Sequence, residues 1–158
     1  MKIINPATGA TIADVATDTL KSIRAKFELA RAAQPGWAAL PIRKRLARIY
    51  AVALDIYLSG EAGPRGCFTV MTAASEVVAD PEIRAMVLEG FSELDKAFAA
   101  CFRLAREKGE LPASADPSVL AQLASATIHT IAIRARAGVP RKELETIVKG
   151  AVEVMLRA

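Results

Sequence analysis

Residues 116–158 read DPSVLAQLASATIHTIAIRARAGVPRKELETIVKGAVEVMLRA, and this stretch decides the fold. The pair Asp116-Pro117 is typical of a helix start, because aspartate caps the first backbone N–H groups and proline suits the first turn. A glycine then turns the chain, and another proline starts a second helix. The pattern predicts helices over 116–137 and 140–156 that pack as an antiparallel hairpin.

Both predicted helices have broad apolar faces with helical spacing. Small residues such as Ala121, Ala132 and Ser125 allow a neighbouring helix to approach closely. A face this wide at the end of a small bundle is either ordinary core or the seam between two copies of the chain, and periodicity alone favours neither. The faces comprise Leu120, Leu123, Ala124, Thr127, Ile128 and Ile131 in the first helix, and Leu144, Ile147, Val148, Ala151, Val152 and Met155 in the second.

The segments before this hairpin also predict helices. Residues 81–108 place apolar side chains at every third or fourth position, up to a stop at Gly109. Shorter apolar patterns predict a helix over 41–58 and a helix buried on most sides over 67–79. Gly90 interrupts the long pattern at a cost of about 1 kcal/mol relative to alanine. This position favours a close helix crossing over a bend or a space for a ligand.

The N-terminal segments have a different character. Residues 2–4 and 11–15 are short, partly alternating stretches around a Pro-Ala-Thr-Gly turn, which predicts a small β-hairpin. Apolar residues at helical spacing after Thr19 predict a helix that stops before Pro35. The fold expected for the chain is therefore all-α, a helical bundle with a small N-terminal β-hairpin and helix.

The composition limits the classes of function. The chain has 158 residues, 53% of them hydrophobic and 24% charged, which supports one independent core and argues against disorder. The net charge of +4 is spread along the chain and gives little support for nucleic-acid binding. Cys67 and Cys101 lie in apolar contexts that are typical of buried free thiols in a reducing compartment. The sequence shows neither a signal peptide nor a membrane span, so we expect a cytoplasmic protein without a membrane partner.

Few residues offer chemistry. Cys101 is interpreted as an inert core thiol, and Cys67 as a structural residue rather than a thiolate activated near a helix N-terminus. His129 is the single histidine, which argues against a multi-histidine metal site. We interpret it as a hydrogen-bonded interface or core residue rather than a pocket residue. The basic run 43–45, with Arg48, is interpreted as a solvated face rather than a phosphate contact. We therefore predict no catalytic residue, no metal and no cofactor.

The opening residues INPATGATIADV, with ARAAQPGWAALPIRKRLARI further on, resemble the N-terminal region of the aldehyde dehydrogenase family. In that family this segment is a peripheral hairpin and helix, so the resemblance implies no catalytic thiolate, base or dinucleotide site here. The resemblance covers about residues 3–49, in which the matching residues are Asn5, Pro6, Thr8, Gly9, Ala30, Ala32, Ala33, Trp37 and Pro41.

The rest of the chain resembles the C-terminal regulatory domain of TetR-type transcriptional repressors. The matching motifs are GPRGCF at 63–68, DPEIR at 80–84, GELP at 109–112 and the closing IHTIAIRARAGVPRKELE. The expected domains are an aldehyde-dehydrogenase-like hairpin and helix segment over 1–49 and a TetR-like ligand-binding and dimerisation domain over 50–158. The sequence looks like a chimera in which no helix-turn-helix precedes Tyr50.

The second resemblance implies a helical bundle that binds a small effector between helices and forms a homodimer through its last two helices. Without a helix-turn-helix, sequence-specific DNA binding is not expected. The implied pocket for a small hydrophobic effector has the candidate walls Phe68, Met71, Phe91, Phe98, Phe102 and His129, which need no ligand if they are ordinary core. The implied dimer interface comprises Leu120, Ala124, Thr127, Ile128, Ile131, Leu144, Ile147, Val148, Ala151, Val152 and Met155.

The expected function is that of a non-catalytic module for ligand sensing and dimerisation. Two alternatives stay open. The first is a remnant of an aldehyde dehydrogenase that is kept for a structural or assembly role. The second is an intact repressor in which residues 18–58 fold as an unorthodox DNA-binding unit.

Overall fold

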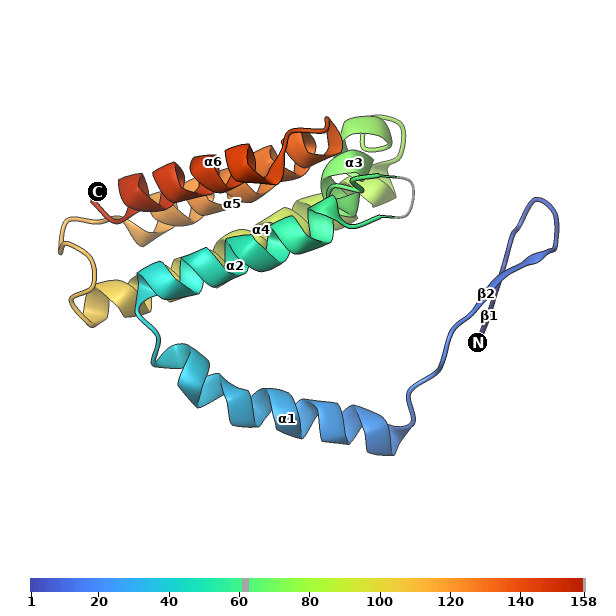
Figure 1. Cartoon of the computed structure of the whole chain (residues 1–158), viewed down its shortest axis with the longest axis horizontal. Helices are drawn as coiled ribbons and strands as arrows, with labels where there is room; N and C mark the ends of the chain where they lie inside the picture. Colours follow the sequence, from blue (N-terminus) through green and yellow to red (C-terminus); the bar gives the residue numbers. More distant parts are fainter. Residues whose placement is uncertain (61–62, 158) are drawn as a thin grey trace. The chain divides into compact units, whose positions relative to one another are not determined.

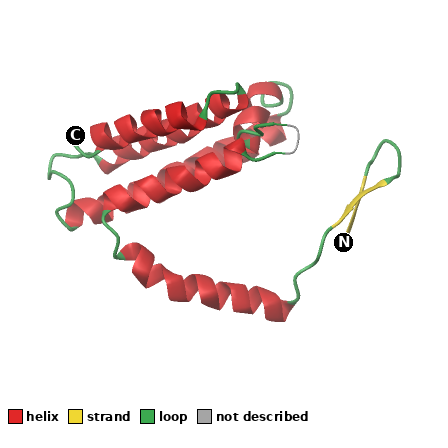
Figure 2. Cartoon of the chain, in the orientation of Figure 1, coloured by secondary structure: helices red, strands yellow, loops and turns green. Residues whose placement is uncertain are grey.

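A computed structural model of the chain describes residues 1–60 and 63–157. Helices dominate these residues, and the strands form one two-stranded hairpin, which confirms the predicted all-α class (Figure 2). The chain divides into two compact units, Met1–Leu40 and Pro41–Ala158. The elements are β1 (Lys2–Ile4), β2 (Thr11–Asp14), α1 (Leu20–Ala38), α2 (Ile42–Leu58), α3 (Phe68–Ser75), α4 (Pro81–Glu107), α5 (Pro117–Arg136) and α6 (Arg141–Met155).

The N-terminal unit begins with the predicted hairpin. Strands β1 and β2 pair antiparallel, with Lys2 opposite Asp14 and a register irregularity after Ile3. The turn between the strands places Gly9 at φ +71°, in the left-handed region that glycine enters without steric cost. No side chain of residues 1–40 is buried, so this unit has secondary structure but no core of its own.

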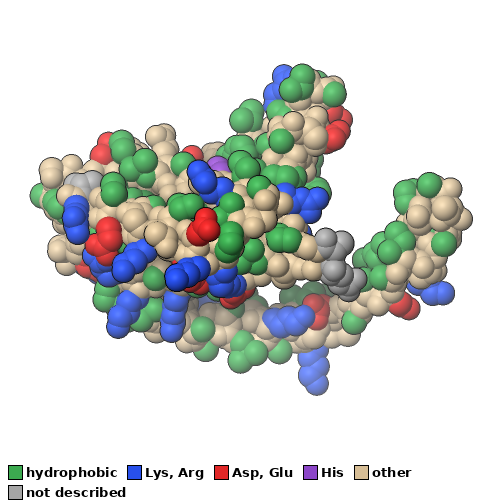
Figure 3. Space-filling model, turned by 45° about the horizontal axis from the view of Figure 1, so that its top comes forward, with side chains coloured by type: hydrophobic (Ala, Val, Ile, Leu, Met, Phe, Trp, Pro, Cys, Tyr) green, Lys and Arg blue, Asp and Glu red, His purple; other side chains and the backbone are tan. Residues whose placement is uncertain are grey.

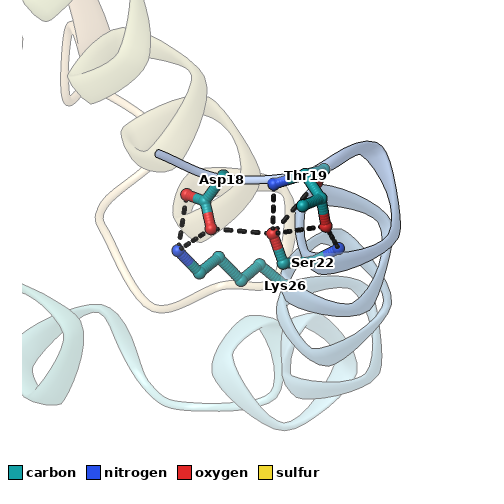
Figure 4. A network of polar contacts seen from close by, with 4 residues as sticks. All are labelled: Asp18, Thr19, Ser22 and Lys26. Carbon is teal, nitrogen blue, oxygen red and sulfur yellow. Dashed lines mark hydrogen bonds and ion pairs between the residues drawn. The ribbon is translucent and has the colours of Figure 1, made fainter. Parts of the chain in front are cut away.

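Helix α1 begins with a capping box (Figure 4). The Ser22 N–H donates to Thr19 Oγ1 over 3.2 Å, and the Thr19 N–H donates to Ser22 Oγ over 2.9 Å. Asp18 accepts a hydrogen bond from Ser22 Oγ and a bond of 2.6 Å from Lys26 Nζ, and Lys26 lowers the pKa of that carboxyl. These contacts satisfy N–H groups that the first turn of a helix leaves without partners.

The predicted end of α1 before Pro35 is wrong, because the helix continues to Ala38 with the proline inside it. Proline removes one backbone donor and strains the preceding turn, but its carbonyl remains an acceptor. Here the Ala39 N–H donates to the Pro35 carbonyl over 3.0 Å, and the Leu40 N–H donates to the Trp37 carbonyl over 3.2 Å. The hydrogen bonds beyond the proline therefore complete the last turn.

In the second unit, α2, α4, α5 and α6 lie side by side, and α3 covers one end (Figure 1). Helix α5 packs against α4, α6 and α2, so it is the central helix of this bundle. Asp80 and Asp116 cap α4 and α5 through their carboxylates, and a proline follows each of them. These two signals are local in sequence, which explains why both helix starts were predicted to within one residue.

The core of the bundle is continuous from α2 to α6. Its largest fully buried side chains include Tyr50 of α2 and Phe102 of α4. The Tyr50 hydroxyl donates to the Ala124 carbonyl over 3.2 Å, and burial raises the pKa of Tyr50 to about 12. The buried phenol therefore remains a neutral donor that ties α2 to α5.

The prediction of a buried helix over 67–79 is wrong in length and in burial. Helix α3 ends at Ser75, and Val70 is its single buried residue. Asp80 must adopt an extended conformation to cap α4, and the residue before a proline avoids the helical region. The chain therefore leaves the helix early, and Arg84 donates hydrogen bonds to the Val77 and Val78 carbonyls in the connecting turn.

Candidate functional site

A cavity of about 300 Å³ lies between α2, α3, α4 and α5. We call it the four-helix cavity. Its walls are mainly apolar, and they carry four side chains with hydrogen-bonding groups. No Lys, Arg, Asp or Glu is among its lining residues, which are Tyr57, Cys67, Thr69, Val70, Gly90, Phe91, Leu94, Ile128 and His129.

One wall of the four-helix cavity is formed by an aromatic pair. The rings of Phe91 and His129 lie 4.7 Å apart between centroids and are tilted by 46°. Burial lowers the pKa of His129, and the negative charge of Asp95 opposes this effect. Among the described residues, none forms a hydrogen bond with the imidazole. A neutral imidazole with a free donor and a free acceptor therefore faces the cavity.

The lining also includes a phenol and a thiol, those of Tyr57 and Cys67. Burial raises the pKa of Tyr57, and the neighbouring Cys67 raises it further. The phenol is therefore neutral near pH 7. Cys67 is half-buried and has no disulfide partner. The thiol is thus within reach of a small reagent that enters the cavity.

The structure places two of the six predicted pocket residues at this cavity, Phe91 and His129. Phe98 and Phe102 belong to the bundle core, at 3% and 0% exposure, and neither lines the cavity. Met71 is half-buried and does not line the cavity. Phe68 is 85% exposed at the first turn of α3 and also lies outside the lining.

Sequence reasoning missed several lining residues. Leu94 follows Phe91 by three positions, so the same helical face could have indicated it. Tyr57 comes from α2, which the predicted pocket did not include. The Gly66 N–H donates to the Tyr57 carbonyl over 3.1 Å, and this contact holds the chain entering α3 against the end of α2. Such a contact between loop and helix leaves no periodic signal in the sequence.

Most of the predicted dimer interface lies inside the subunit. Eight of its eleven residues are buried in the core of the single chain, so their apolar character is explained without a second copy. Thr127, Ile147 and Ala151 remain partly exposed. The buried eight are Leu120, Ala124, Ile128, Ile131, Leu144, Val148, Val152 and Met155.

Other apolar side chains remain exposed on the last two helices. Val119, Leu123 and Ile133 of α5 are 50%, 45% and 51% exposed, and their spacing places them on one face of the helix. Val154 of α6 is 65% exposed and follows Ile147 at helical spacing. We call these five residues the outer apolar stripe.

A second hollow of about 300 Å³ lies between α2 and α6. Its rim is charged, and an ion pair between Arg43 and Glu153 crosses it. A further pair, Arg141 with Asp55, also links the two helices. All four side chains are about one-third to two-thirds exposed, so water and salt screen both pairs and each contributes little to stability. Arg43 and Glu153 are paired with each other, whereas the His129 imidazole has no hydrogen-bond partner among the described residues, so we take the four-helix cavity as the candidate ligand site.

The described residues also bear on metal binding, membrane insertion and surface charge. No three His, Cys, Asp or Glu side chains within residues 1–60 and 63–157 are grouped to hold a metal ion. None of the described helices combines the length and the apolar character needed to cross a membrane. Lys and Arg are interspersed with acidic and apolar side chains on the face shown in Figure 3.

Two family models match the sequence. The model for the tetracyclin repressor-like C-terminal domain matches residues 43–151, and the model for the aldehyde dehydrogenase family matches residues 1–57. The two matches overlap within α2, and the compact units divide before it, between Leu40 and Pro41. The domain boundary predicted between residues 49 and 50 stays a prediction.

Solved structures with the same fold are also found. Two of them are cysteine-substituted forms of the TetR family transcriptional regulator CifR complexed with 26-bp double-strand operator DNA. Each is 20% identical in sequence, with a TM-score of 0.66 over 84% of this chain and 70% of the other. No curated protein matches the sequence significantly.

Proposed function

This chain belongs to the tetracyclin repressor-like C-terminal domain family, and we propose that it is the effector-sensing and dimerisation module of a transcriptional regulator. The four-helix cavity is the proposed effector site. The observation that carries the proposal is the Phe91–His129 pair in the wall of that cavity. An apolar hollow with a few polar groups is the usual form of a small-molecule site.

The chemistry of the walls supports an uncharged effector. A carboxylate or ammonium ligand would lose its hydration without gaining an opposite charge, because the lining residues carry none. The neutral His129 imidazole offers one hydrogen bond to a ligand, and Phe91 offers a ring for stacking or edge contact. We therefore propose a small aromatic or aliphatic molecule with one hydrogen-bonding group.

Binding of N-phenyl-1-naphthylamine, an uncharged probe that fluoresces in apolar sites, tests this proposal. Phe91→Ala should weaken binding of the probe by about tenfold or more, because it removes a ring from the wall. Phe68→Ala is the matched control, since Phe68 is 85% exposed outside the cavity, and it should leave the affinity unchanged. No saturable binding, or equal losses in both variants, would refute the proposed site.

We propose that the homodimer forms through the outer apolar stripe rather than through the buried residues of α5 and α6. An exposed apolar face on adjacent helices is the type of surface that a second copy covers. Because Leu120, Ile131 and Leu144 are fully buried inside the subunit, the proposal turns to the apolar side chains that remain exposed on these helices.

For DNA, we propose that the described residues give no sequence-specific binding. Residues 1–40 hold a hairpin and one helix, whereas base readout by a helix-turn-helix needs a second helix placed in the major groove. A mobility-shift experiment with random and palindromic duplexes at physiological salt tests this point. A sequence-preferring complex would favour the alternative in which residues 18–58 act as the DNA-binding unit.

We propose no catalytic role for the segment that matches aldehyde dehydrogenases. Both cysteines, Cys67 and Cys101, lie beyond the matched residues 1–57, so the match includes no thiol nucleophile. Incubation of the chain with a nicotinamide dinucleotide and a range of aldehydes should give no reduction of the cofactor. Turnover above a protein-free control would contradict this assignment.

A further inference from the structure

Gly90 lies in the middle of α4 and lines the four-helix cavity. Glycine weakens a helix interior relative to alanine, so its presence calls for a local reason. Backbone conformation does not provide one, because Gly90 is not among the glycines with positive φ. Two explanations for the glycine remain: a neighbouring helix packs too closely for a side chain, or the position borders open space.

Close packing does not require a glycine at this position. A Cβ atom at Gly90 would have one neighbour within 4 Å, Thr69 Cγ2 at 3.9 Å, which is an ordinary van der Waals distance. Gly66 shows the contrast, since a Cβ there would lie 3.1 Å from the Ala132 carbonyl oxygen of α5. The helix crossing expected at Gly90 is therefore not observed. A side chain there would extend between α3 and α4 into the cavity.

We propose that Gly90 sets the upper size limit of the ligand in the four-helix cavity. The inference rests on the proposed effector site and adds to it a residue that determines specificity. The missing side chain leaves space beside Thr69, which also lines the cavity. An uncharged ligand with more than one ring occupies this space. A larger residue at position 90 would fill it and exclude such a ligand.

The test compares Gly90→Ala and Gly90→Leu with the unmodified chain in titrations with N-phenyl-1-naphthylamine. One methylene-sized group in an apolar pocket changes affinity by about tenfold or more, so Gly90→Ala should weaken binding by about that factor. Gly90→Leu should abolish saturable binding. Gly150→Ala on α6 is the matched control, because its Cβ would meet nothing within 4 Å, and it should leave the affinity unchanged.

Thermal unfolding distinguishes a size limit from damage to the fold. Both alanine variants remove a glycine from a helix, so each should raise Tm by about 2–4 °C. A variant that is more stable and yet binds the probe less tightly supports the proposal. Equal affinity in the unmodified chain and both Gly90 variants overturns the role of Gly90 alone. If the unmodified chain does not bind the probe, both the effector site and this proposal fail.

Discussion

Single residues show where the chain departs from an ideal core. Arg45 of α2 is 2% exposed, and its Nε and Nη2 have no hydrogen-bond partner among the described residues. The basic run 43–45 was interpreted as a solvated face, and Arg43 and Lys44 are indeed exposed, whereas Arg45 is not. The fourth helical position after Pro41 faces inward, and an apolar pattern gives no reason to expect a charge there. Sequence alone therefore could not place this guanidinium.

Replacement of Arg45 by methionine should stabilise the bundle. Burial of unpaired guanidinium nitrogens costs about 1–3 kcal/mol, and methionine fills a similar volume without that cost. We expect Arg45→Met to raise the free energy of unfolding in urea by about that amount. Arg48→Met, at an exposed position one turn further on, should change it by less than about 0.5 kcal/mol. A destabilised Arg45→Met would show that the buried guanidinium makes a favourable interaction.

The pKa of His129 makes the stability of the bundle depend on pH. Burial lowers this pKa below 6.5, so the unfolded chain binds more protons than the folded chain between the lowered value and 6.5. The free energy of unfolding should therefore rise as the pH is raised through this window, and the same stability is lost when the pH is lowered through it. His129→Gln should remove this slope while keeping Asp95, the charged neighbour. Urea denaturation at a series of pH values from about 5 to about 8 measures this slope. The prediction is contradicted if the free energy of unfolding depends on pH in the same way in the unmodified chain and in His129→Gln.

At the scale of helices and strands, a helix end was predicted correctly where the residues that determine it are adjacent in the sequence. The starts of α4 and α5 depend on an aspartate and a proline next to each other, and both were predicted. The end of α1 depends on hydrogen bonds beyond Pro35, and the end of α3 depends on the cap of the following helix. The predictions for these two ends are wrong. A proline or an apolar run does not indicate which hydrogen bonds and caps the following residues form.

The capping box of α1 should be essential for that helix. No residue of α1 is buried, so its stability depends on local interactions, and loss of a capping side chain costs about 1 kcal/mol. Thr19→Ala should therefore accelerate amide hydrogen exchange throughout α1 in the full chain. Thr146→Ala is a suitable comparison, because that hydroxyl bonds to the Lys142 carbonyl inside α6 and caps no helix start. Unchanged exchange in α1 would argue that contacts other than the cap hold it.

At the scale of the whole molecule, the sequence pattern predicted which helix faces are apolar but not what covers them. Periodicity identified apolar faces on α5 and α6, but it did not decide whether α2 and α4 or a second subunit covers them. The structure shows α5 packed between α4, α6 and α2, which accounts for the inner faces. The cavity was predicted in part, because Phe91 and His129 lie on neighbouring helices, whereas Tyr57 reaches it through contacts between distant segments.

A double substitution of the outer apolar stripe tests the proposed dimer. Ile133→Glu with Val154→Glu should convert a dimer to a folded monomer, because two buried like charges in each subunit would lack partners at the interface. Light scattering on a sizing column gives the mass, and circular dichroism confirms the helix content. Val52→Glu on α2, 57% exposed, is the control and should leave the dimer intact. An unmodified chain that is monomeric at micromolar concentration would refute the dimer.

The absence of buried side chains in residues 1–40 has a calorimetric consequence. The heat capacity increment of unfolding comes mainly from apolar area that becomes hydrated, and this unit has little such area to release. The measured increment should therefore be smaller than the total obtained by multiplying the average per-residue increment by 158 residues. It should be close to the increment of the bundle alone. A protease that cleaves in the β1–β2 turn should shorten the chain without altering the endotherm.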